Sequence, residues 1–198
     1  PGADDNCSAS AALLLAAPVF LDLSRHGKLG CDVWLLHLTG EEYPAAGLGA
    51  WDFIRRIVEG TLRMHLPSGR PRDLSSTRVQ GLYVMDMIAH NTRRDPDVFQ
   101  IAPGSGHEAW WCAWHMHEAT RIWNDSVAKW NQARRGAKRG QRRRSGRVPP
   151  EIALHPTLRG EVRVEYDPRS TLYNTDGQAF SDAGVPVVLL MENYDLLR

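Results

Sequence analysis

Acidic residues lie at three points in this chain where an apolar stretch gives way to a loop. Asp4 and Asp5 are near the start, Glu41 and Glu42 follow a segment dense in Val, Trp and Leu, and Asp86 ends another apolar run. Hard divalent cations prefer carboxylate oxygens, and two such ions held close together need one bridging carboxylate and terminal ligands for each. Since strand ends are where active groups collect in open α/β sheets, the three loops predict a site for a pair of cations.

Adjacent glutamates can divide two roles in such a site. Hydrolysis of a peptide bond by bridged metal ions needs metal ligands and also a free carboxylate that accepts a proton from water. Neighbouring side chains in an extended turn point in different directions, so Glu42 can face a metal ion while Glu41 faces the water. Zinc would also take imidazole ligands, yet no histidine precedes Asp5 and none follows His155. We therefore expect the chain to be a fragment that is cut at both ends of its site.

Hydrophobic patterning predicts the elements that position these loops. We expect buried strands at 31–38, 79–87 and 185–191, short strands at 97–101 and 162–164, a loop at 61–77, and helices over 11–17, 51–58, about 107–132 and 180–183. Strands that alternate with helices predict an α/β fold with a mostly parallel sheet covered on both faces. The apolar stripe of the longest helix is more typical of a core than of a ligand site.

Bulk composition is that of one globular domain. A chain of 198 residues with 42% hydrophobic and 24% charged residues can bury one full core. Its three cysteines have no close spacing, so neither a disulfide framework nor a cysteine-based metal site is indicated. The longest apolar stretch, 11–21, contains Pro18 and is too short to span a bilayer, so no membrane partner is expected.

The net charge of +1 conceals an uneven distribution. Eight of the 24 basic residues lie between Arg134 and Arg147 without any acid among them; the other 16 face 23 acidic residues, so the rest of the chain carries −7. Clustered Arg and Lys could bind nucleic acid or anionic lipid by releasing counterions, but this tract has no interleaved aromatic residues. A solvated, partly disordered insertion at about 133–150 is the favoured interpretation, and no nucleic-acid partner is expected.

Four short motifs occur in order along the chain: Gly-Ala-Asp-Asp-Asn-Cys-Ser at 2–8, Thr-Gly-Glu-Glu at 39–42, Met-Asp-Met at 85–87, and Thr-Asp-Gly-Gln-Ala-Phe-Ser-Asp-Ala-Gly-Val-Pro at 175–186. Together they resemble the zinc exopeptidases typified by bacterial leucyl aminopeptidase and glutamate carboxypeptidase, which form metallopeptidase family twenty-eight. Each motif alone is weak, but the ordered set spans nearly the whole chain. The resemblance implies a single zinc-peptidase-like domain over 1–198, a three-layer α/β/α sandwich with a mixed, mostly parallel central sheet that is incomplete at both termini.

The resemblance also implies a role for each acidic residue. Asp5 would bridge two zinc ions, Glu42 would bind one of them, and Asp86 would bind the other. Glu41 would be the general base. One histidine ligand for each zinc ion would come from outside residues 1–198, so we expect this stretch alone to be inactive.

Further residues would support the site without binding metal. Asp4 would orient its loop or a missing histidine, and Asp176 would be a second supporting carboxylate. Tyr173, just before the last motif, could polarise the scissile carbonyl. Two positions depart from the family pattern, because Cys7 replaces a commonly found glycine and Gly177 stands where many members have histidine.

The implied activity is that of an aminopeptidase-like metallopeptidase. A hydroxide bound to two zinc ions would attack the first peptide bond of a substrate with a free N-terminus, and Glu41 would pass the proton to the leaving amine. A glutaminyl-cyclase-like acyltransferase with one zinc ion, or a catalytically inactive binding or receptor-like domain, stays open on the same fold. The resemblance implies a secreted or periplasmic protein.

Histidines within the chain are not expected to bind these metals. His115 and His117 are two residues apart on a predicted helix and so face nearly opposite sides. His37 and His90 lie near the acidic loops in sequence, but we expect both to pack within the fold.

Overall fold

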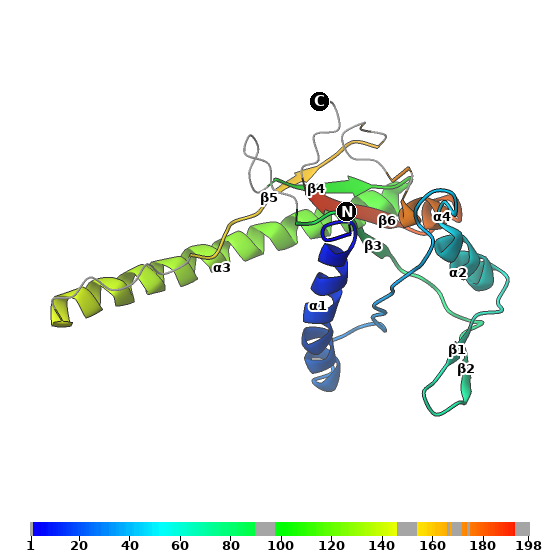
Figure 1. Ribbon diagram of the computed structural model, residues 1–198, viewed down its shortest axis with the longest axis horizontal. Helices are drawn as coiled ribbons and strands as arrows, with labels where there is room; N and C mark the ends of the chain where they lie inside the picture. The colour runs from blue at the N-terminus through cyan, green and yellow to red at the C-terminus, as the bar shows by residue number, and fades with distance from the viewer. Residues whose placement is uncertain are drawn as a thin grey trace.

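A computed structural model describes residues 2–89, 98–145, 154–165, 167, 172–173 and 175–192, with only the helical backbone described for 137–145. In chain order the elements are α1 (Cys7–Arg25), α2 (Leu48–Val58), β1 (Arg63–His65), β2 (Pro71–Asp73), β3 (Leu82–Met85), β4 (Val98–Pro103), α3 (His107–Ser145), β5 (Arg159–Val162), α4 (Asp176–Asp182) and β6 (Val187–Glu192). Figure 1 shows a small sheet with helices around it, from which α1, α3 and the β1–β2 hairpin project.

The central sheet has four strands in the order β3-β6-β4-β5. The β3–β6 and β4–β5 pairs are parallel, while β4 and β6 run antiparallel. This confirms the predicted α/β class with a mixed, mostly parallel sheet. Strand β6 lies inside the sheet and is buried from Val187 to Met191, because a strand covered on both faces needs apolar side chains at consecutive positions.

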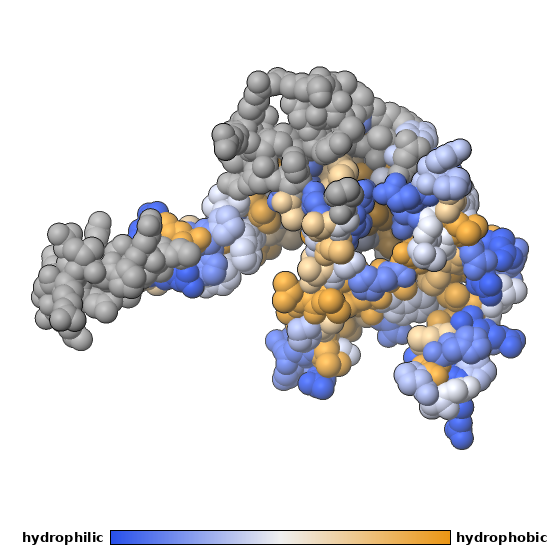
Figure 2. All heavy atoms as spheres, in the orientation of Figure 1, coloured by the Kyte–Doolittle hydropathy of each residue, from blue (hydrophilic) through white to orange (hydrophobic). Residues whose placement is uncertain are grey.

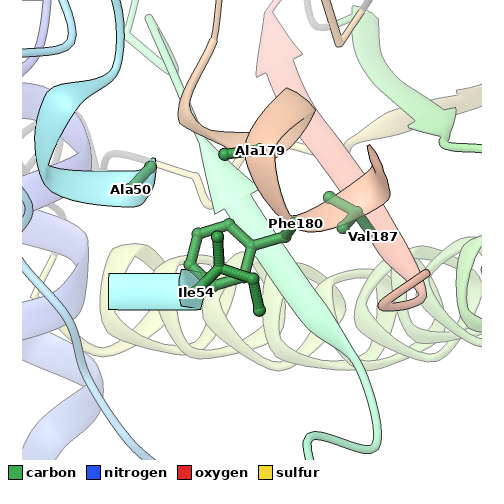
Figure 3. Packing of buried hydrophobic residues seen from close by; sticks show 5 residues of the cluster. All are labelled: Ala50, Ile54, Ala179, Phe180 and Val187. Atoms are coloured by element: carbon green, nitrogen blue, oxygen red, sulfur yellow. The ribbon is translucent and has the colours of Figure 1, made fainter. Parts of the chain in front are cut away.

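Helices pack on both faces of this sheet. On one face, Ala113 of α3 lies against Ile101 of β4 and against Val188 and Leu190 of β6. On the other face, α2 and α4 enclose a cluster of Ala50, Ile54, Ala179, Phe180 and Val187 (Figure 3). Alternate side chains of β6 thus point to different helices, as the two-residue period of a strand requires.

The predicted stripe on α3 is confirmed in part. Ala109, Ala113, Thr120 and Val127 are buried, whereas Met116 and Trp123 are half-buried and Trp130 is exposed. The predicted end of this helix near residue 132 is wrong. Helix α3 continues to Ser145 and extends past the sheet into solvent (Figure 1). The basic tract is rich in Arg, Lys, Gln and Ala, which have high helix propensity, so the expected solvated, disordered insertion is helical up to residue 145. Residues 146–150 of that prediction lie outside the described residues.

Two asparagines on α3 hold the returning chain. The Asn124 side chain makes two hydrogen bonds with the backbone of Leu158, at 2.7 and 2.8 Å. The Asn131 side chain makes two with the backbone of His155, at 2.9 and 3.0 Å. The His155 ring also lies 5.5 Å from that of Trp130. The segment that leads into β5 is therefore fixed along α3 before it joins the sheet edge.

Two further sequence predictions are wrong. Residues 31–38 form no strand, and a cavity of about 180 Å³ lies between this segment and β3 instead of backbone pairing. Apolar side chains alone do not make a strand, because a strand needs a partner edge to satisfy its backbone groups. Residues 61–77, expected to be a loop, contain the β1–β2 hairpin.

Helix α1 stands apart from the sheet and buries only Ala9, and several of its large apolar side chains are exposed, among them Leu14 (70%) and Leu15 (76%) (Figure 2). It is longer than the predicted 11–17 helix, with Pro18 inside it. By length and composition alone it could cross a membrane, a test that signal sequences and core helices also pass. The prediction that this apolar stretch is too short to span a bilayer is therefore wrong for the helix that forms, although length and composition alone are weak evidence for a membrane span.

Candidate functional site

The N-terminal loop is fastened to the carboxyl end of β3. The Asn6 side-chain amide donates to the Met85 carbonyl at 2.9 Å, and the Ala89 N–H donates to Asp4 Oδ1 at 2.9 Å. Ser8 Oγ accepts from the Ile88 N–H at 3.2 Å. Asp5 is linked to Asn6 by a cis peptide bond and lies between these anchors. These contacts bring Asp5 to the end of β3, where Asp86 begins the next loop.

Asp86 is fixed by the sheet itself. Its N–H donates to the Leu190 carbonyl at 3.0 Å, which continues the β3–β6 pairing by one residue. Burial is the largest cause that raises the pKa of its carboxyl to about 6, and the negative charges of Asp5 and Glu42 raise it further. Asp86 therefore faces both other acidic loops.

The Glu41–Glu42 loop is closed by backbone hydrogen bonds before α2 begins. The Gly47 N–H donates to the carbonyls of Gly40 and Glu41 at 2.8 and 3.0 Å, and the Gly49 N–H donates to the Thr39 carbonyl at 2.9 Å. A Cβ at residue 49 would collide with that Thr39 carbonyl, so the loop needs glycine there. This compact turn leaves Glu42 exposed and Glu41 half-buried.

Glu41 is the most perturbed acid of the site. Its pKa is raised from 4.5 to about 7, first by burial and then by the charges of Asp86, Glu42, Asp176 and Asp5. Like charges raise a carboxyl pKa appreciably only at short range. Glu41 therefore lies within electrostatic range of acidic residues from the other two predicted loops and of Asp176.

Asp176 has a more central position than the sequence analysis gave it. It begins α4, whose N-cap Thr175 accepts a hydrogen bond from the Gly177 N–H at 3.2 Å. The Asp176 Oδ1 atom is buried without a hydrogen-bond partner in the described part of the chain, and burial raises the pKa of this carboxyl. That oxygen points toward the Gly47 turn, since a Cβ at Gly47 would lie 4.0 Å from it.

Gly177 has a structural reason to differ from the family pattern. The residue is buried, and a Cβ there would collide with the Leu172 side chain and lie 3.2 Å from Val187 Cγ1. A histidine therefore does not fit at this position of α4. Cys7, the other departure, is the exposed first residue of α1.

Other candidates lie elsewhere or stay untested. His37 is exposed, with Nδ1 at 3.4 Å from Ser10 Oγ, and His90 lies outside the described residues. His115 packs on Trp111 of α3, on the sheet face opposite α4. Tyr173 is 47% exposed, and its proposed contact with a substrate carbonyl stays a prediction.

The acidic residues offer donor atoms of a type that divalent cations prefer, but their described arrangement is not that of a formed metal site. Within the described ranges, no three or more His, Cys, Asp and Glu side chains are arranged as a ready metal site. Carboxylate oxygens are nevertheless suitable ligands for zinc and for harder ions. The mutual repulsion around Glu41 and the unpaired Asp176 oxygen leave negative charge that a cation would offset.

Comparison of the chain with protein-family models, curated proteins and solved structures gave no match. The functional interpretation therefore rests on the residues of the site and their geometry.

Proposed function

We propose that this chain contributes the acidic half of a metal-dependent exopeptidase site of the aminopeptidase type. The observation that supports it most is the pKa of Glu41, which is raised to about 7, first by burial and then by the charges of Asp86, Glu42, Asp176 and Asp5. A solvated acidic surface would keep its carboxyl pKa values near 4, because water screens exposed charges. The perturbation instead resembles that of sites in which a carboxyl group takes up and releases a proton near neutral pH.

In this proposal Asp5, Glu42 and Asp86 are the residues of this chain that would hold the cations. Two zinc ions, when bound, would supply Lewis acidity toward water and a substrate carbonyl. One imidazole for each ion would come from sequence outside residues 1–198, as the family resemblance implies. For the fold, we propose the three-layer α/β/α sandwich of the same family, in which the central sheet has more strands than the four that the structure describes.

Glu41 is the proton acceptor in this scheme. A general base is most effective when its pKa lies near the working pH, because it can then both accept and return a proton. In the metal-free chain, burial and the neighbouring carboxylates hold Glu41 close to that condition. The turn that carries Glu41 is closed by its own backbone hydrogen bonds and places the Glu41 carboxyl near the other acidic residues.

The acidic surroundings also favour a particular substrate end. A free peptide N-terminus carries an ammonium group at neutral pH. Carboxylates around the cations, with Asp176 beside them, would attract such a group, and this favours an exopeptidase that acts at the N-terminus. Which residue the enzyme prefers there depends on pocket walls outside the described contacts.

A cation titration of residues 1–198 tests the metal-binding part of the proposal. We expect weak Zn²⁺ binding by calorimetry that is lost in Asp86→Asn and kept in Asp22→Asn, an exposed α1 control. Loss of an imidazole from each ion should remove a large share of the affinity. Tight binding of two zinc ions by this chain would contradict the need for outside ligands, and binding that ignores Asp86→Asn would contradict the site.

Activity is tested on the chain with its natural flanking sequence. We expect aminoacyl-nitroanilide hydrolysis that falls by ~10² or more in Glu41→Gln with unchanged zinc content, as loss of a general base typically produces. One zinc ion per chain together with glutaminyl cyclisation would instead identify the acyltransferase alternative. Absence of both metal and turnover would identify an inactive binding domain.

A further inference from the structure

The distal part of α3 is a helical arm beyond the sheet. Helix α3 passes its last buried described residue at Val127 and runs on to Ser145, and Figure 1 shows it projecting away from the other elements. This segment contains most of the basic tract of the chain. The continuous helix sets the spacing of the basic residues, which an irregular insertion would not.

Helical register arranges six of these residues in two rows. Arg134, Lys138 and Arg142 are four apart, and so are Arg135, Arg139 and Arg143. At 3.6 residues per turn the six positions span about half of the helix circumference. We call this set of six the cationic face. The opposite side holds four small residues, Ala133, Gly136, Ala137 and Gly140, and one further basic residue, Arg144.

We propose that the cationic face binds the phosphate backbone of duplex DNA. Its charge density is the first argument. The six positions span about 14 Å of helix axis at 1.5 Å per residue. Duplex DNA presents about eight phosphate charges over the same length, at one per ~1.7 Å. A fully extended acidic peptide offers about four, at ~3.4 Å per residue, so the nucleic acid matches the six cations better.

Shape is the second argument. An α-helix with its side chains is about 10–12 Å across, and the major groove of B-form DNA is about 12 Å wide. A helix of this width can enter the groove with its two basic rows toward the phosphates that line it. The deep, narrow major groove of an RNA duplex does not admit a helix in this way.

The composition of the arm argues against a bilayer as its partner. A helix that lies in a membrane interface combines basic residues with large apolar ones such as Trp, Phe or Leu on the other side. Between Ala133 and Ser145 the arm has no residue of that kind. Its small side would bury too little apolar surface to hold it in lipid.

Energetics give the arm a reason to bind a polyanion. Within the two rows, four pairs of like charges stand at i and i+4, and each such pair destabilises a helix by about 0.2–0.5 kcal/mol. Phosphates placed along the rows would remove this repulsion. Binding should therefore release counterions and also raise the helix content of the chain.

Fluorescence anisotropy with a labelled duplex of about 20 base pairs tests the proposal across about 50–200 mM salt. We expect residues 1–198 to bind with a slope of log Kobs against log salt of about −5, since each of six phosphate contacts contributes ~0.9. A variant in which all six residues are replaced should lose at least ~100-fold in affinity, with its slope reduced toward zero. Its substitutions are Arg134→Gln, Arg135→Gln, Lys138→Gln, Arg139→Gln, Arg142→Gln and Arg143→Gln.

A matched control removes six exposed charges from the body: Arg25→Gln, Lys28→Gln, Arg63→Gln, Arg70→Gln, Arg72→Gln and Arg78→Gln. It should keep nearly the whole slope although its net charge equals that of the arm variant. Gln has a helix propensity close to that of Arg and Lys, so circular dichroism should show the arm variant still folded.

Three outcomes would overturn the proposal. Equal loss of affinity in the two variants would show that net charge alone attracts DNA. Full displacement of the duplex by polyglutamate at the same total charge would identify an acidic polypeptide as the partner. Binding to phosphatidylserine vesicles without salt-dependent binding to the duplex would identify a membrane surface.

Discussion

Replacement of Glu41 by glutamine should stabilise the metal-free chain at alkaline pH. Folding raises the pKa of this carboxyl from 4.5 to about 7. The folded chain therefore holds the proton more tightly than the unfolded chain does, so the stabilisation is complete below pH 4.5 and is lost as pH rises through about 7. Gln carries no charge at any pH and avoids this loss.

The expected size follows from the same shift. A carboxyl pKa raised from 4.5 to about 7 means that ionising Glu41 destabilises the folded chain relative to the unfolded chain by at most ~3 kcal/mol. Glu41 is only half-buried, so solvent screening reduces this figure, and we expect Glu41→Gln to gain about 1–2 kcal/mol at pH 8. At pH 4 the carboxyl is protonated in both states, and the gain should vanish.

Urea unfolding in the presence of a chelator measures this difference at the two pH values. Glu59→Gln is the matched control, because Glu59 is an exposed glutamate that pairs with Arg55 at 2.9 Å on α2. We expect no gain from that control at either pH, since an exposed pair contributes only ~0–1 kcal/mol. A Glu41→Gln chain that is destabilised at pH 8, or equally stabilised at both pH values, would refute the argument for repulsion at the site.

Other changes test the packing that positions the site. Gly177→His should lower the free energy of unfolding by at least ~2 kcal/mol, because the new Cβ would collide with the Leu172 side chain and press on Val187. An unchanged free energy of unfolding would show that α4 can move to make room. Asn131→Ala should cost about 1–3 kcal/mol through the His155 backbone groups left unpaired, and unchanged protection of the His155 amide in hydrogen exchange would contradict this. Phe180→Ala should lower the free energy of unfolding by about 3–5 kcal/mol, because Phe180 fills the cluster between α2, α4 and β6. Leu15→Ala, on the exposed side of α1, should lower it by under ~0.5 kcal/mol. Similar losses for the two variants in urea unfolding would contradict this packing.

Elements with strong local signals were predictable from the sequence. The buried run that becomes β6 was predictable, because five consecutive apolar residues introduced by Pro186 are short for a helix and suit a strand covered on both faces. Helix α2 ends at Val58 with Gly60 just beyond it, in the left-handed conformation that glycine favours. The buried stripe of α3 was also predictable, because Ala109, Ala113, Thr120 and Val127 recur at helical spacing.

Elements that depend on partners were not predictable. Residues 31–38 have the composition of a buried strand, but pairing is a property of two segments, and here β3 stays apart across a cavity. The extension of α3 to Ser145 reflects helix propensity within a tract whose charge suggested disorder. Local composition could not decide between these outcomes.

For the site, the sequence predicted which acids would lie near one another, and the shared grouping of Asp5, Glu42 and Asp86 stays a prediction. Glu42 and Asp86 follow apolar stretches, and Asp5 precedes one. The buried, unpaired oxygen of Asp176 was not predictable, because it depends on how α4 packs against the Gly47 turn. The acidic start of a helix after Thr175 was the only signal, and such starts are common for capping reasons alone.

Carbon NMR of the side-chain carboxyl groups during a Mn²⁺ titration tests whether the acidic residues share a cation, since paramagnetic broadening reports even weak binding at short range. We expect Asp5, Glu42 and Asp86 to broaden together, and before exposed acids on α1 and at the end of α2 such as Asp22 and Glu59. Broadening of those exposed acids first, or of Asp5, Glu42 and Asp86 at clearly different metal concentrations, would contradict a shared cation site.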